Sequence, residues 1–402
     1  MKKKKILIYI AFALIMAGLG ASDSQRGIFA GIFEKHFDLT MSRVSLIVTV
    51  SYIGNLVFIL LGSRLADRFE KKKVFLCASF LWMAGLLLYV LTDNYYVLLV
   101  GMFVTMGTST LMNTMINIMS PMVFGASAGM LINTLFFTQG IGTTANQNIT
   151  GRFATDYGSF RLVNIILICL GIAGTLIMLS VRFPEEKEEK RQADSVQRTA
   201  GVTGKIIKNP AFFLFVFIFG FYFIAEHGIM NWWKTYLERS PEFDSGQAAV
   251  YLSIFFGGMT LGRLVFSPFV SKLGEMKSML IFGGAGTVLY IAGLAGGTHT
   301  ALLLSISGLF ISIVYPTMVL FIRRFFPGNI VSSATGMVIS TATVFDIAFN
   351  FIFGRLVENS GFTNVMFIFP VSMGIFYALY LLLSARKKKG DINAGTSMGT
   401  EA

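Results

Sequence analysis

Residues 64–92 read RLADRFEKKKVFLCASFLWMAGLLLYVLT, a short charged segment followed by an apolar run. No charged side chain interrupts residues 74–92. A helix that crosses a bilayer needs about 20 apolar residues at a rise of about 1.5 Å each, so this run is long enough to cross. The segment before it is rich in Lys and Arg, as cytoplasmic loops of membrane proteins are. The stretch therefore predicts a basic loop that leads into a transmembrane helix.

The composition of the whole chain agrees with this interpretation. Of 402 residues, 54% are hydrophobic and 13% are charged, whereas about a quarter of the residues of a soluble protein are charged. A soluble globular fold is therefore excluded. With three His and two Cys, the chain has little material for a metal centre or a disulfide framework. We expect neither a metal site nor a cofactor.

Further apolar runs of similar length bring the predicted total to twelve transmembrane helices. The predicted spans are residues 6–33, 44–63, 74–92, 95–119, 123–150, 162–181, 210–234, 248–270, 278–297, 300–322, 330–355 and 360–385. With a cytoplasmic amino terminus, the main basic clusters all lie on the cytoplasmic side. We therefore expect a multi-pass protein of the cytoplasmic membrane with both termini in the cytoplasm. This asymmetry accounts for the net charge of +12, so the charge does not predict a nucleic-acid partner.

Two stretches of the chain repeat each other at an offset of about 205 residues. Residues 126–132 read ASAGMLI and residues 333–339 read SATGMVI, and the dipeptide GR follows at 151–152 and again at 354–355. The repeat predicts a duplicated six-helix unit. The predicted organisation is an N-terminal six-helix bundle over 1–182, a cytoplasmic linker over 183–209, a C-terminal six-helix bundle over 210–389 and a flexible tail over 390–402.

Residues 64–72 resemble the signature loop G-x-L-A-D-R-x-G-R-K of the major facilitator superfamily of secondary transporters. Ser63 stands where the first Gly belongs, and Glu70 where the second does. Residues 272–277, KLGEMK, are similar to the degenerate second copy of this loop. The resemblance covers the whole chain and implies an all-α membrane protein with twelve transmembrane helices in two six-helix bundles.

The same loop implies a gate. In this fold Asp67 would approach the start of the eleventh span near residues 329–333, and a carboxylate stabilises a helix N-terminus by about 0.3–1 kcal/mol. We therefore expect Asp67 and the neighbouring Arg68 to take part in gating on the cytoplasmic side. Arg68 also has a simpler interpretation as a topogenic charge.

Within the superfamily, the chain resembles the branch of fucose, glucose and galactose proton symporters. Four short motifs carry this resemblance: Asp23 in span one, Asn117 and Asn133 with Gln139 in spans four and five, Glu226, Trp232, Tyr236 and Leu237 in span seven, and Ser312, Tyr315, Pro316 and Thr317 in span ten. Fucose-type members place a second carboxylate in span four, whereas this chain has no Asp or Glu between Asp93 and Asp156. The resemblance implies transport of a monosaccharide together with a proton.

A few ionisable residues remain inside the predicted apolar runs. They are Asp23, Arg26, Glu226, His227, Arg263 and Asp346. A charge at a helix centre costs about 2.5 kcal/mol or more, so such groups face a partner or a water-filled cavity. Asp23 and Arg26, three residues apart, could form a self-neutralising pair or belong to a functional polar patch with Gln25. Arg263 is expected to extend to the cytoplasmic interface.

Polar side chains at helical spacing define the candidate substrate site. The candidate substrate-binding residues are Gln25, Asn55, Asn113, Asn117, Asn133, Gln139, Glu226, His227, Asn231, Trp233, Asp346 and Asn350. The candidate proton-coupling residues are Asp23, Arg26, Glu226 and His227. Two alternatives stay open: Trp232 and Trp233 could form part of an aromatic belt at the membrane surface, and each Asn could serve only as an interhelical hydrogen-bonding group.

The sequence carries no nucleotide-binding loop or metalloprotease motif, so we expect a transporter rather than an enzyme. Uphill transport would then draw on an ion gradient. The first hypothesis is a secondary transporter, acting as a monomer in the lipid bilayer, that moves a small polar solute such as a monosaccharide by alternating access with a proton. The alternatives are efflux of amphipathic drug-like compounds and a membrane sensor that transports nothing.

Overall fold

A computed structural model describes residues 2–181, 183, 203–327 and 330–397, without the side chains of residues 2, 63–64, 66–67 and 386–397. The described residues are almost entirely helical and include no strand. The first half contains α1 (Lys2–His36), α2 (Met41–Arg68), α3 (Lys71–Leu91), α4 (Tyr95–Phe124), α5 (Ala128–Ala145), α6 (Gly151–Phe153) and α7 (Tyr157–Ser180), with the one-turn segments η1 (Gly125–Ser127) and η2 (Asn146–Thr150). The second half contains α9 (Pro210–Glu238), α10 (Ser245–Leu273), α11 (Glu275–Ser278), α12 (Gly284–Ala295), α13 (Ala301–Ile311), α14 (Val314–Ile322), α15 (Val331–Ser360), α16 (Phe362–Met366) and α17 (Ile368–Ser397), with η3 (Met279–Gly283) and η4 (Gly297–Thr300).

Eleven segments of the described chain are long and apolar enough to cross a membrane. One of them, Tyr95–Phe153, has 59 residues and would be about 90 Å long as a single helix, about three times the hydrocarbon thickness. Gly125, with a φ of 57° that favours glycine, ends α4 and turns the chain back into α5. The segment therefore makes two crossings, and the prediction of twelve transmembrane helices is confirmed.

Short polar caps define several helix starts in the loops. The Asn94 side chain accepts hydrogen bonds from the backbone N–H groups of Tyr96 and Val97 at the start of α4. Asp156 caps α7, and its hydrogen bonds from the backbone and hydroxyl of Ser159 lower the pKa of its carboxyl group. These caps mark the starts of α4 and α7.

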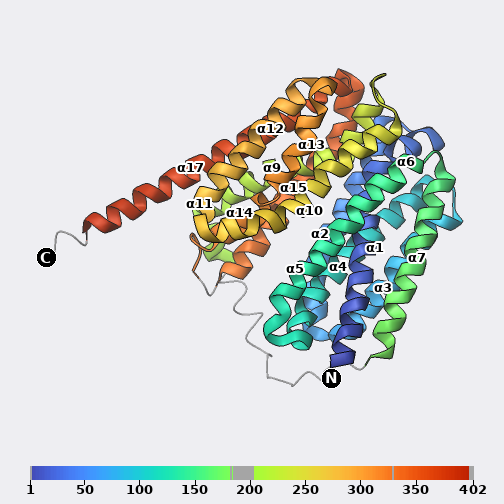
Figure 1. Cartoon of the computed structure of the whole chain (residues 1–402), viewed down its shortest axis with the longest axis horizontal. Helices are drawn as coiled ribbons and strands as arrows, with labels where there is room; N and C mark the ends of the chain where they lie inside the picture. The colour runs from blue at the N-terminus through green and yellow to red at the C-terminus, as the bar shows by residue number, and fades with distance from the viewer. Residues whose placement is uncertain (1, 182, 184–202, 328–329, 398–402) are drawn as a thin grey trace.

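The helices form two bundles that lie side by side, one from blue to green and one from yellow to red in Figure 1. In the first bundle α1 packs on α5 and α7, and α2 packs on α4; in the second α9 packs on α15 and α17, and α10 on α13. The bundles meet where α2 contacts α15, α5 contacts α10 and α1 contacts α9. The two-bundle, all-α architecture expected from the sequence is confirmed.

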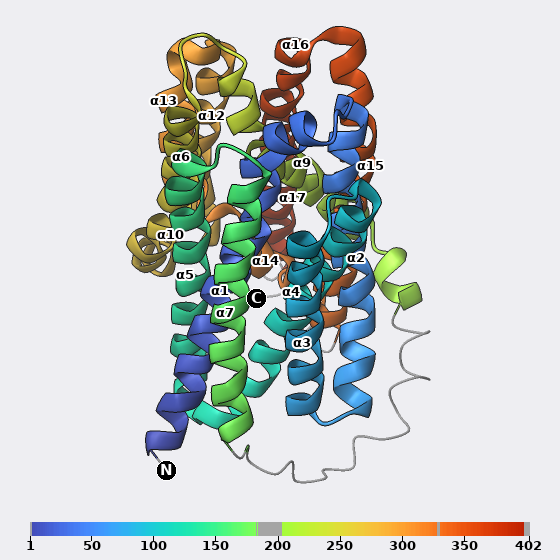
Figure 2. The ribbon, with the colours of Figure 1, turned by 90° about the vertical axis from the view of Figure 1, so that its right-hand side faces the viewer.

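The bundles are tightly joined at the end away from the N-terminus, which is uppermost in Figures 1 and 2 and is called the far end below. Two glycines make this approach possible. Gly151 packs against Ala249 of α10, and Gly354 packs against the backbone of Met41 and Ser42 at the start of α2. These are the two glycines of the repeated GR dipeptide, so the repeat places one close contact on each side of the interface.

Polar contacts reinforce the far end. The Arg239 guanidinium, through Nη2, donates to both carboxylate oxygens of Glu34 at 2.9 and 3.0 Å. The Glu358 carboxylate accepts from the backbone N–H and the hydroxyl of Ser42, both at 2.8 Å. Each of these contacts joins one bundle to the other.

The structure describes only parts of the predicted linker and tail. Residues 184–202 of the linker lie outside the described residues. The chain continues as α17 to Ser397, past the predicted end of the last bundle at 389 (Figure 1). The flexible tail over 390–402 therefore stays a prediction.

Replacement of Gly354 by Leu should force α15 away from α2. A side chain at this position would collide with the α2 backbone, and overpacking of this kind costs about 1–3 kcal/mol. We expect a lower midpoint of thermal unfolding in detergent than for Gly336→Leu, the matched control on the same helix, where no atom lies within 4 Å of an added Cβ. Equal midpoints for the two variants would show that the close approach at Gly354 does not stabilise the fold.

Candidate functional site

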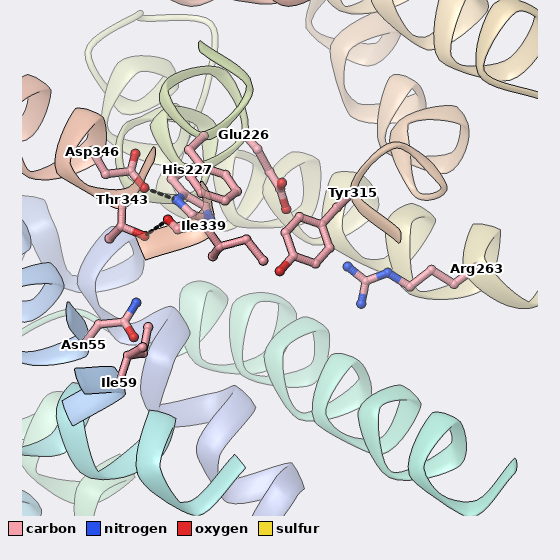
Figure 3. A pocket seen from close by; sticks show the side chains of 10 residues that line it. Asn55, Ile59, Glu226, His227, Arg263, Tyr315, Ile339, Thr343 and Asp346 are labelled. Atoms are coloured by element: carbon pink, nitrogen blue, oxygen red, sulfur yellow. Dashed lines mark hydrogen bonds and ion pairs between the residues drawn. The ribbon is translucent and has the colours of Figure 1, made fainter. Parts of the chain in front are cut away.

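A cavity of about 310 Å³ lies between the two bundles (Figure 3). Its wall comes from α2, α9, α10, α14 and α15, and the lining residues are Asn55, Ile59, Phe223, Glu226, His227, Arg263, Tyr315, Ile339, Thr343 and Asp346. Carboxylates, a guanidinium and an imidazole therefore share one space with aromatic and aliphatic side chains. A second hollow of about 430 Å³ between α5 and α10 is lined by no charged side chain.

His227 and Asp346 form the most closely bonded pair in this cavity. His227 Nδ1 lies 2.5 Å from Asp346 Oδ2, which joins α9 to α15. The Asp346 side chain is 1% exposed, whereas the His227 side chain is 24% exposed. The pair thus presents its imidazole to the cavity and keeps its carboxylate behind it.

The His227 ring packs between two other rings. Phe223, one turn earlier on α9, lies parallel to it with centroids 5.2 Å apart. Tyr52 of α2 stacks on it at 5.4 Å and an angle of 21°, and this contact crosses from one bundle to the other. Asn231 Nδ2 donates to the Tyr52 hydroxyl at 3.2 Å, and the Arg26 guanidinium lies 4.7 Å from the centre of the Tyr52 ring. Tyr52 is therefore held in place by partners from both bundles.

Glu226, Tyr315 and Arg263 line another part of the cavity wall (Figure 3). The Glu226 side chain is 9% exposed, whereas Arg263 is exposed. From the sequence, Arg263 is expected to extend to the cytoplasmic interface, and the structure places its exposed side chain in the wall of the cavity. Gly262, the residue before Arg263, packs against Leu309 of α13. Successive residues of a helix point in directions about 100° apart, so Arg263 does not share the direction of this contact.

The structure brings four of the predicted substrate-binding residues together in the cavity: Asn55, Glu226, His227 and Asp346. Three others are fully buried beside it. The Asn350 amide oxygen accepts from Trp232 Nε1 at 3.1 Å, and its Nδ2 donates to the Asp346 carbonyl. Asn231 holds Tyr52, and Trp233 stacks on Tyr236 with centroids 5.5 Å apart. None of these three side chains lines the cavity.

The remaining predicted residues lie outside the cavity wall. Gln25 is 1% exposed, Asn113 and Gln139 are partly buried, and Asn117 and Asn133 are exposed. None of these five residues is among those that line the cavity. Spacing along one helix could not show this.

Asp23 and Arg26 do not pair with each other in the described structure, so a self-neutralising pair is not formed. Asp23 Oδ2 accepts from the Ser109 hydroxyl of α4 at 2.9 Å, whereas Arg26 Nη1 donates to the Ser51 hydroxyl of α2 at 2.7 Å. The predicted gating residue Asp67 belongs to α2, but its side chain lies outside the described part of the structure, and Arg68 is exposed at the end of that helix.

Sequence reasoning missed several lining residues. Phe223, Ile59 and Ile339 give no signal in an apolar span, because their residue types are the same as those that face lipid. Tyr315 belongs to the motif of span ten, and Thr343 lies one turn before Asp346. Among the described residues, no group of three His, Cys, Asp or Glu could hold a metal ion.

Comparisons with known proteins agree with this arrangement. A "Putative glucose/galactose transporter" of Helicobacter pylori (strain J99 / ATCC 700824) is 24% identical over 267 residues, which are 65% of this chain and 62% of that protein. The chain thus matches less than two thirds of the length of that relative. A second relative with the same description, from strain ATCC 700392 / 26695, is 25% identical over 272 residues, 66% of this chain and 64% of the relative.

Solved structures show the same fold at low sequence identity. The nucleoside transporter NupG superposes with a TM-score of 0.72 at 17% identity, covering 95% of this chain and 98% of that one. FucP, a Major Facilitator Superfamily transporter in the outward conformation, gives 0.66 at 16% identity, covering 94% and 98%. Residues 6–344 match the Major Facilitator Superfamily itself. The chain therefore belongs to the Major Facilitator Superfamily.

Proposed function

We propose that the protein is a secondary transporter that moves a small polar solute of the monosaccharide class across the cytoplasmic membrane by alternating access. The observation that carries this proposal is the cavity between the bundles, where charged and aromatic side chains face one another. Folds of this kind bind their substrates at the interface of the two repeats. The descriptions of the Helicobacter pylori relatives support the same class of solute.

The lining suits a polyhydroxylated ring. Glu226 and Asn55 offer oxygen atoms that accept hydrogen bonds from hydroxyl groups, and Arg263 offers donors. Phe223 and Tyr315 supply flat apolar surface for the C–H face of a sugar. A volume of about 310 Å³ lies at the lower end of the range of small-molecule sites.

The contacts at the far end support an alternating mechanism. Arg239–Glu34 and Glu358–Ser42 join the bundles there and would have to break for the cavity to open on that side. Each such exposed pair stabilises the closed far end by about 0–1 kcal/mol. The free energy of substrate binding can therefore offset the loss of these pairs. Asp67 and Arg68 remain the proposed gating residues at the opposite end.

We propose that a proton gradient drives transport and that Asp23, Arg26, Glu226 and His227 are the candidate coupling groups. A symporter needs a group whose proton affinity differs between its two states. Glu226 and His227 line the cavity, and Asp23 lies on α1 against α4. The protein is proposed to act as a monomer, with both termini in the cytoplasm because the basic clusters lie at their end of the bundles.

Single cysteines test this orientation in a background where Cys77 and Cys169 are replaced by serine. The far-end substitutions are Asp38→Cys, Ser240→Cys and Asn359→Cys, and the opposite set is Lys72→Cys, Gln192→Cys and Lys388→Cys. In sealed right-side-out cells an impermeant maleimide should label the first set only. Labelling of the second set before permeabilisation would contradict the proposed sidedness.

Glu226→Gln tests the substrate site in proteoliposomes. It keeps the shape of the side chain but removes a charged acceptor, and hydrogen bonds to charged groups contribute about 1.5–3 kcal/mol. We expect uptake of D-glucose or D-galactose to fall by at least about tenfold. Glu242→Gln, which changes an exposed carboxylate at the far end, should transport as the unmodified protein does.

Equal uptake by Glu226→Gln and the unmodified protein would remove Glu226 from the site. Flux of amphipathic dyes without monosaccharide flux would instead favour efflux. Saturable sugar binding with no flux in either direction would favour a sensor.

A further inference from the structure

We propose that the His227–Asp346 pair binds the coupling proton and that Tyr52 seals this pair from the far end. The inference rests on the proton-coupled transport proposed above and names the group that carries the proton. It adds Asp346 and Tyr52, which neither the family resemblance nor the helical spacing assigns to this role.

The chemistry of the pair favours uptake of one proton. His227 uses Nδ1 for Asp346, so a neutral ring carries its hydrogen there and leaves Nε2 to accept a proton from water in the cavity. Asp346 Oδ1 is buried without a hydrogen-bond partner among the described residues. One proton added at Nε2 therefore turns a pair of net charge −1 into a neutral ion pair, and its release from the same nitrogen restores the charge.

The charges around the pair explain why Asp346 is needed. The Arg26 guanidinium of α1 lies over the Tyr52 ring, which also stacks on His227. A protonated His227 would therefore be repelled by the positive charge of Arg26. Glu226, the neighbour of His227 on α9, and Asp346 of α15 oppose that repulsion, while Arg263 of α10 and Tyr315 of α14 share the same cavity. Asp23 is turned toward Ser109 instead.

The position of Tyr52 links the pair to the state of the bundles. Tyr52 is 2% exposed and belongs to α2, whereas His227 and Asp346 belong to the other bundle. The same α2 touches α15 at Ser42–Glu358 and where Gly354 N–H donates to the Ser45 hydroxyl. Separation of α2 from α15 would open the far end and draw Tyr52 off the imidazole in one motion. The proton site would then be open to the far end.

A measurement without any solute tests this inference. Spin labels at Tyr96→Cys and Asn359→Cys, exposed far-end positions on opposite bundles, report the opening of that end once Cys77 and Cys169 are replaced by serine. In reconstituted protein, the distribution of label distances should shift between pH 5 and pH 8. His227→Gln and Asp346→Asn should each abolish that shift.

His299→Gln is the matched control, because this exposed imidazole also faces a carboxylate, that of Glu242 at 3.7 Å, but lies outside the cavity. It should keep the full shift. An undiminished shift in either His227→Gln or Asp346→Asn would overturn the assignment of the proton site to this pair. The assignment would also be overturned if Asp23→Asn lost the shift while His227→Gln retained it.

The seal has its own readout. Tyr52→Leu removes the ring that covers His227, so proteoliposomes with this variant should leak protons faster than the unmodified protein without any sugar present. An unchanged leak would overturn the role of Tyr52. Because neither measurement needs a transported sugar, a failure to find monosaccharide uptake would refute the proposed substrate class while these results still decide the proton site.

Discussion

A charge inside a bilayer must be paired or hydrogen-bonded by the protein itself, and the arrangement of this chain follows from that constraint. An unbalanced charge at a helix centre costs about 2.5–3.5 kcal/mol on insertion scales. Asp346 meets His227, Asp23 meets Ser109, and Arg26, 4% exposed, meets Ser51 and the face of Tyr52. The Tyr52 ring, on which both Arg26 and His227 pack, brings part of this polar interior to the interface of the two halves.

This coincidence couples electrostatics to movement. The contacts of Tyr52 with His227 and Asn231 cross between the bundles, as does the contact of Arg26 Nη2 with the Met230 sulfur at 3.8 Å. When the bundles change their relative tilt, these groups exchange protein partners for water. A change in hydration alters the cost of a charge, so proton binding and bundle movement influence each other in the proposed cycle.

The sequence predicts the fold well because its signals are long. An apolar run of about 20 residues has few alternatives to a transmembrane helix, and the repeated GR dipeptide indicates a duplicated unit. Boundaries are less certain: the fourth span, predicted to end at 119, continues as α4 to Phe124, and the chain reverses only at Gly125. The turn depends on one backbone conformation, which the apolar pattern does not encode.

The site is predictable only in part. Glu226, His227 and Asp346 stand out because ionisable residues in apolar spans are rare. Asn350 has an equally suitable residue type, yet Trp232 of α9 donates to its amide oxygen, and spacing along α15 alone does not show what another helix places against it. Arg263 is a similar case. Its position near the end of the eighth span suggests the cytoplasmic interface, and only the three-dimensional arrangement shows that its side chain lines the cavity.

The far end and the cavity differ in what holds them, and the difference suits a structure with two states. The far end is closed by backbone contact at Gly151 and Gly354 and by exposed pairs such as Arg239–Glu34, whose side chains are 40% and 30% exposed. Each such pair contributes about 0–1 kcal/mol, whereas removal of one partner from a buried pair costs about 3–5 kcal/mol. The buried His227–Asp346 pair lies wholly within one bundle and can survive the movement, while the weaker contacts between bundles break. A ligand that changes the net charge of that pair needs to favour one state by only a few kcal/mol to shift the balance, because about 5.5 kcal/mol takes a two-state equilibrium from 1:99 to 99:1.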